Sequence, residues 1–256
     1  MNELTAQLPL LLLVTLRVAG VTAVSPVFAN RFIAVPVRVF FTFLLALLIL
    51  PGARAVPEAL EGYGFAAACV LELVVGLLIG FLSQLVFSVF LMAGAVLDFD
   101  MGLAMASVID PVYSQSQQLL GSFFNTLALV VYFGLNAHHW LLRALAESYG
   151  ALPAGGLSLD SPAFPYIVSL FGKMMAAAVQ MVLPFMAVML LTTAVLGAVN
   201  RAVQQFQLFQ ISLGVKSLMG LLMLFLVLPY LVGFLQPLFE SGHSALLRLL
   251  ELMRQS

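Results

Sequence analysis

Long apolar runs constrain this chain more than any other feature of its sequence. Hydrophobic residues make up 63% of the 256 residues and charged residues only 8%, whereas a soluble domain is about 25% charged. A chain of this composition cannot place a charged surface over its core, so we predict an all-α integral membrane protein. The apolar runs cover residues 8–28, 33–50, 63–97, 119–142, 164–199 and 218–239.

Two of these six runs are too long for one simple crossing. A membrane-spanning helix needs about 20 residues, but 63–97 and 164–199 would each exceed about 50 Å as straight helices. Each is therefore predicted to be a hairpin or a long, tilted helix that protrudes from the bilayer. Pro184 favours a kink or break in the second run. Gly76 and Gly80 have a spacing that permits close packing of helices.

The few polar residues exclude several classes of function. The formal net charge is −1 and there is no Lys/Arg-rich run, so no nucleic-acid partner is expected. The sequence has no phosphate-binding P-loop motif. His138 and His139 are adjacent and would project in different directions from a helix, which is poor geometry for a metal. We expect no enzyme activity, no metal and no cofactor.

Three ionisable residues lie inside apolar runs, namely Arg17, Glu72 and Lys173. An ionised side chain at the bilayer centre costs about 2.5–3.5 kcal/mol. These residues belong either to a proton or ion path or to pairs that are buried or reach the membrane surface. No series of acids at helical spacing links them, which favours the second interpretation.

The stretch 94–121 is too polar to face lipid and too apolar to be a free linker. It contains no Lys or Arg. We predict that it folds into the interior of a membrane assembly and obstructs a pore; the alternative is a packed re-entrant turn. Met is flexible enough to seal an irregular opening. The candidate plug residues are Asp98, Met101, Gly102, Met105, Asp110 and Pro111.

Helix signals within this stretch predict its boundaries. A helix from Gly94 would end near Val108 and would place Gly94, Asp98, Met101 and Met105 on one face. Asp110-Pro111 is typical of a capping residue followed by Pro at the first helical position. This pair predicts the start of a helix that runs towards Trp140.

A second polar loop is predicted at residues 200–217, between two apolar helices. Glutamine offers donors and an acceptor without a charge, so this loop suits a contact surface near a membrane, although an ordinary solvated turn is the alternative. Residues 150–163 combine Gly, Pro and Ser and are predicted to separate two parts of the chain. The candidate contact residues are Arg201, Gln204, Gln205, Gln207, Phe209 and Lys216.

Three segments carry a resemblance to a known family. VLDFDMGLAMASVIDP (96–111), FGLNAHHWLLRALAESYGALPAGG (133–156) and NRAVQQFQLF (200–209) resemble the FliR family of flagellar export-apparatus proteins, which is related to the SctT-type proteins of injectisomes. The resemblance covers nearly the whole chain. The third segment departs from the family pattern, which has Pro-Gln in place of Gln204-Gln205 and Pro in place of Gly214.

This resemblance implies a subunit of the flagellar type III export gate, packed with FliP and FliQ in a hetero-oligomer of the bacterial inner membrane. It implies a FliP-like part at 1–150 with the plug at 94–121, and a FliQ-like hairpin at 164–256 with the Gln-rich loop at its tip. Unfolded flagellar subunits would pass through the gate, with FlhB at its entrance and FlhA nearby. The gate would belong to the flagellar basal body and protrude partly from the bilayer.

Three alternatives to this function remain open from the sequence. One is an independent secondary transporter, which could use Glu72 and Lys173. Another is a subunit of an injectisome export gate, because the two branches of the family are related. The third is a purely structural membrane scaffold.

Overall fold

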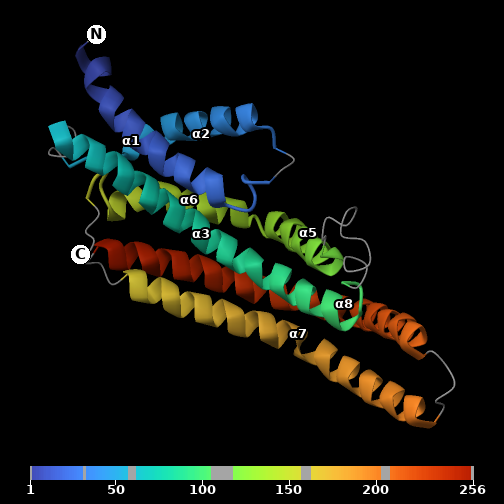
Figure 1. Ribbon diagram of the computed structural model, residues 1–256. Coiled ribbons are helices and arrows are strands. Elements are labelled where there is room, and N and C mark those ends of the chain that lie inside the picture. Colours follow the sequence, from blue (N-terminus) through green and yellow to red (C-terminus); the bar gives the residue numbers. More distant parts are fainter. Residues whose placement is uncertain are drawn as a thin grey trace. The chain divides into compact units, whose positions relative to one another are not determined.

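The computed structural model describes residues 2–30, 33–56, 62–104, 118–156, 163–202 and 208–254 (Figure 1). These residues form helices and no strand, apart from one isolated bridge between Ala55 and Ala154. The all-α prediction is therefore confirmed. The helices are α1 (Asn2–Val24), α2 (Val35–Ile49), the 3₁₀ turn η1 (Leu50–Gly52), α3 (Gly62–Asp100), α5 (Leu119–Gly134), α6 (Ala137–Ala151), α7 (Ala163–Ala202) and α8 (Leu208–Arg254).

Four described helical segments are long and apolar enough to cross a membrane, and α5 with α6 makes a fifth if the pair counts as one span. In Ile211–Leu231, only 6% of the most apolar 18-residue stretch is buried within the chain. A soluble protein cannot leave so much apolar surface in water, so the chain is a membrane protein. The four segments are Val35–Gly52, Gly64–Asp100, Pro165–Arg201 and Ile211–Leu231.

The two runs predicted to be very long each form a single helix and not a hairpin. Helix α3 has 39 residues and α7 has 40, which corresponds to about 60 Å. Pro184 lies inside α7 without ending it. A third long helix was not predicted: α8 has 47 residues and extends well beyond 218–239 at both ends. Its C-terminal extension is amphipathic and buries Leu246, Leu249, Leu250 and Met253, a stripe that a search for apolar runs does not detect.

The prediction of one helix from Asp110 to about Trp140 is wrong for its described part. Helix α5 begins at Leu119 and ends at Gly134, and α6 begins at Ala137. Between them Asn136 has φ = 55°. Asn tolerates this left-handed conformation better than most residues, and it ends the helical path that hydropathy alone would continue.

The described chain divides into two compact units. Unit 1 comprises residues 1–86, 136–171 and 239–256, and unit 2 comprises residues 87–135 and 172–238. These units group residues by contact, so each draws on both sides of the boundary predicted at 150–163. The division into FliP-like and FliQ-like parts stays a prediction.

In unit 1, α1 lies against α3 at a very close crossing (Figure 1). A Cβ at Gly76 would overlap the carbonyl oxygen of Arg17, and one at Gly80 would lie 3.0 Å from the carbonyl oxygen of Val21. From the other side, a Cβ at Gly20 would lie 2.7 Å from the carbonyl oxygen of Leu73. The two backbones therefore meet where both helices lack side chains.

Unit 2 brings together the end of α3, all of α5, the C-terminal part of α7 and the N-terminal part of α8. Its core contains Phe90, Phe124 and Phe185, each about 1% exposed. Phe87 packs edge-on against Tyr132, with 5.5 Å between ring centroids. This core holds both described ends of the stretch 94–121.

Candidate functional site

A buried ion pair in unit 1 joins α1 to α3. The Nε of Arg17 donates to Oε2 of Glu72 at 2.5 Å, and Nη2 donates to Oε1 at 2.8 Å. The two side chains are 0% and 1% exposed. This two-pronged geometry is the strong form of the arginine–carboxylate contact. Arg17 and Glu72 thus form a buried pair, which agrees with the interpretation that charges inside the apolar runs are paired and do not form an ion path.

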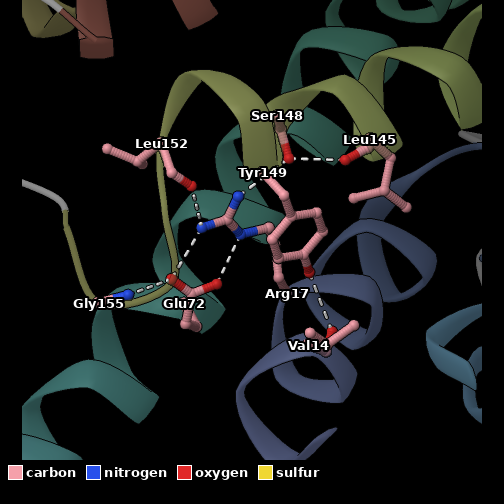
Figure 2. A network of polar contacts seen from close by, with 8 residues as sticks. All are labelled: Val14, Arg17, Glu72, Leu145, Ser148, Tyr149, Leu152 and Gly155. Carbon is pink, nitrogen blue, oxygen red and sulfur yellow. Dashed lines mark hydrogen bonds and ion pairs between the residues drawn. The ribbon is translucent and has the colours of Figure 1, made fainter. Parts of the chain in front are cut away.

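Helix α6 and the residues after it complete this network (Figure 2). Arg17 also donates to the hydroxyl of Ser148 at 3.0 Å and to the carbonyl oxygen of Leu152 at 3.1 Å. The backbone N–H of Gly155 donates to Oε1 of Glu72 at 2.9 Å. The ring of Tyr149 lies 4.0 Å from the guanidinium carbon of Arg17. The pair therefore fixes three separate stretches of chain in one place.

The segment 152–156 also pairs with the segment that follows η1. Ala154 N–H donates to the carbonyl oxygen of Arg54 at 2.8 Å, and Val56 N–H donates to that of Ala154 at 3.0 Å. Ala154 is fully buried. This part of the predicted boundary is therefore built into unit 1 and is not a free linker.

The sequence did not indicate the contributions of Ser148, Leu152 and Gly155 to this network. Arg17 and Glu72 are 55 residues apart and Arg17 and Leu152 are 135 apart, and no local pattern links such positions. The sequence did contain one signal, which is opposite charge: Arg17 and Glu72 are a cation and an acid that each lie alone within an apolar run. Lys173, the third such residue, is exposed, and no ion pair involves it in the described part of the chain.

In unit 2, α3 ends earlier than predicted. The helix stops at Asp100, not near Val108. Gly102 has φ = 75°, and its N–H donates to the carbonyl oxygen of Phe99 at 3.1 Å. A glycine in this left-handed conformation is a common helix stop. Gly94, Asp98 and Met101 lie in α3 or at its end and are all buried, so they can share a face as predicted, but residues 101–104 form turns, and Met105 lies outside the described residues.

The carboxylate of Asp98 caps the start of α5. It accepts the N–H of Leu120 at 3.1 and 3.2 Å through its two oxygens, and the N–H of Gly121 at 3.5 Å. Gln118, at the capping position of α5, makes no side-chain capping bond. The side chain of Asp98 is buried. An acid at a helix N-terminus satisfies free backbone donors and interacts favourably with the helix dipole.

Two glycines close the same junction. A Cβ at Gly94 would overlap the backbone of Gly121, so α3 and α5 approach within backbone contact. Together with the Asp98 cap, this contact holds the two described ends of the stretch 94–121 side by side. We call this junction of Gly94, Asp98, Leu120 and Gly121 the neck.

Met101 lies directly after the neck and is 2% exposed. A Cβ at Gly220 of α8 would overlap the Met101 side chain, and one at Gly102 would overlap the Leu213 side chain of α8. Met101 therefore fills space that is open because Gly220 has no side chain. Of the predicted plug residues, Asp98, Met101 and Gly102 lie in or next to the neck, whereas Met105, Asp110 and Pro111 lie outside the described residues.

Removing the Asp98 cap should loosen the start of α5. Asp98→Ala deletes the acceptor for two backbone donors, which costs about 1 kcal/mol for a helix cap. We expect hydrogen exchange at the amides of Leu120 and Gly121 to rise roughly fivefold. Asp100→Ala is the control, because the described caps of these amides come from Asp98 alone. Equal exchange in both variants would contradict the capping role.

The described residues of the predicted loop at 200–217, namely 200–202 and 208–217, are helical. Helix α7 continues to Ala202 and α8 begins at Leu208, so Arg201 lies in the last turn of α7, while Phe209 and Lys216 belong to α8. Helix formers such as Leu208 and Leu213 extend α8 through a stretch that polar composition alone suggested was a loop. Arg201 is exposed and Lys216 half-buried. Gln204, Gln205 and Gln207 lie outside the described residues.

Groups of three or more His, Cys, Asp or Glu side chains that could hold a metal do not occur among the described residues. His138 and His139 lie at the start of α6 with ring centroids 4.1 Å apart. Trp140 contacts His243 of α8 with tilted rings, whose centroids are 5.3 Å apart. The contact of Trp140 with His243 joins α6 to α8 within unit 1.

Comparison with known proteins gives one family over most of the chain. The family described as "Bacterial export proteins, family 1" matches residues 8–242. Flagellar biosynthetic protein FliR of Bacillus subtilis is 28% identical over 99% of each chain. The Escherichia coli protein of the same name is 25% identical, over 88% of this chain and 87% of its own. Secretion system apparatus protein SsaT of Salmonella typhimurium is 31% identical over 62% of each chain.

Proposed function

This chain belongs to the bacterial export proteins of family 1, and we propose that it is a subunit of a flagellar type III export gate. In this proposal it forms, with FliP and FliQ, the channel through which unfolded flagellar subunits cross the inner membrane at the basal body. FlhB lies at the entrance of the channel and FlhA is nearby. The observation that carries the proposal is similarity to a flagellar biosynthetic protein over 99% of both chains.

The flagellar branch is favoured over the injectisome branch because a larger share of this chain aligns with the flagellar relative. The Bacillus subtilis FliR aligns over 99% of this chain, whereas the Salmonella SsaT aligns over 62%. An independent transporter is supported less well, because the carboxylate of Glu72 is already held by Arg17 and Gly155. An ion-binding acid would need an oxygen free for its ligand.

Within the gate, we assign the stretch 94–121 to the plug. The neck joins its two ends at the close contact of α3 with α5, and Met101 is buried against Gly220 at its start. A segment anchored at both ends can obstruct a passage without diffusing away from it. The contact with partner subunits is assigned to Arg201 at the end of α7, to Gln204, Gln205 and Gln207 after it, and to Phe209 at the start of α8.

Deletion of residues 101–112 should make the gate leak. The expected result is entry of a small membrane-impermeant dye into cells that carry the variant assembly, with little entry in wild-type cells. Met101→Ala, which retains the neck, should leak in the same direction but less. Co-purification with FliP and FliQ is the control for assembly. An assembled deletion variant with wild-type permeability would reject the plug.

A further inference from the structure

A cavity lies between α7 and α8 in unit 2, and the proposed function does not account for the residues that line it. Its volume is about 280 Å³. Helix α7 supplies five lining residues and α8 supplies two, and none of the seven is acidic. They are Thr193, Leu196, Gly197, Val199, Asn200, Ser212 and Lys216.

The cation in this cavity has no acidic partner nearby in the sequence. From Ser161 to Phe239 the chain contains Lys173, Arg201 and Lys216 but no aspartate or glutamate. No ion pair involves Lys216 among the residues that the structure describes. A half-buried ammonium group favours a nearby anion, and residues 161–239 supply none.

The cavity also lies at the polar end of two apolar helices. The apolar segment of α7 ends at Arg201, and that of α8 begins at Ile211. The end of an apolar helical segment is a position where lysines commonly extend towards lipid headgroups. On the same two helices, Val195 and Leu218 are 62% and 67% exposed, so apolar side chains near this end of the helices also face outward.

We propose that this cavity binds the phosphate group of an anionic phospholipid. Lys216 supplies the charge and the Asn200 amide a donor, while Leu196 and Val199 contact the apolar part of the lipid. Basic pockets between membrane helices bind such headgroups. A headgroup without its own ammonium is preferred, because no acid in the cavity would balance that ammonium. The inference needs only a membrane location, so it stands or falls independently of the export function.

Lipid retention by the full-length protein tests this site. The protein is purified from membranes in mild detergent, mixed with equal amounts of phosphatidylglycerol and phosphatidylethanolamine with matched acyl chains, and its bound lipids are counted by native mass spectrometry. We expect phosphatidylglycerol to be retained over phosphatidylethanolamine by roughly fivefold. Lys216→Gln should abolish the preference. Lys173→Gln, which removes an exposed cation of α7 outside the cavity, should keep it.

Three results would overturn the proposal. One is equal preference in the Lys216→Gln variant and the wild type. Another is complete release of the lipid by soluble glycerol phosphate at matched concentration, which would identify a site for free phosphate. The third is unchanged lipid binding in Lys216→Gln together with reduced recovery of partner subunits, which would place a protein carboxylate against Lys216.

Discussion

Glu72→Ala should destabilise unit 1 by about 3–5 kcal/mol, because it leaves the guanidinium of Arg17 buried without a counter-ion. Arg17 is 0% exposed, so it cannot regain water without separating α1 from α3. The variant also deletes the acceptor for Gly155 N–H and frees the segment 152–156 at one end. Trp140 is the only tryptophan and lies on α6 of the same unit. Its fluorescence during denaturation of the full-length protein in detergent measures the loss.

The size of this loss should depend on charge and not on side-chain volume. Glu147→Ala removes an exposed acid from α6 and should leave the unfolding midpoint nearly unchanged. The double variant Arg17→Met, Glu72→Leu should regain much of the lost stability, since well-packed apolar groups can replace a buried ion pair. A double variant as unstable as Glu72→Ala would contradict this explanation.

Gly76→Ala should separate α1 from α3 and destabilise the protein by about 1–3 kcal/mol. The added methyl would overlap a backbone carbonyl oxygen, and a carbonyl group within a helix cannot rotate aside as a side chain can. Gly197→Ala is the matched control, because a Cβ there meets nothing within 4 Å. That control should be neutral or more stable, by up to about 1 kcal/mol, since alanine favours helices.

The same fluorescence assay compares the two glycine variants. Equal midpoints for Gly76→Ala and Gly197→Ala would mean that the crossing of α1 and α3 tolerates a side chain, against the geometry. The two substitutions add the same atoms to helical positions, so a difference between their midpoints reports the environment of each glycine.

The sequence predicted the class of fold from composition, because apolar length and scarce charge leave few other folds available. It placed both ends of α2 and the start of α3 within two residues of their observed positions, but it predicted the end of α3 eight residues too late. It failed where tertiary contacts decide the backbone. Gly102 and Asn136 adopt left-handed conformations, and a single sequence does not distinguish such a glycine or asparagine from one inside a helix.

For the candidate site, too, the sequence indicated the residues that stand out from their neighbours and missed those whose role depends on distant contacts. Met101 and Asp98 attracted notice because they are unusual for their surroundings, and the structure shows what each contacts. Gly220 and Ser148 could not be chosen from the sequence, since a glycine or serine in an apolar helix is common. Their roles depend on partners more than a hundred residues away along the chain.

The buried pair also constrains how the chain is made. Arg17 is synthesised 55 residues before Glu72 and 135 residues before Leu152, whose carbonyl oxygen accepts a hydrogen bond from Arg17. At about 5–20 residues per second, the arginine waits several seconds for its carboxylate and longer for the rest of its partners. During that interval the first helix carries an unpaired cation that disfavours the hydrocarbon phase. Stable insertion of α1 is therefore expected to follow the emergence of α3 from the ribosome, so the nascent chain enters the bilayer as a group of helices.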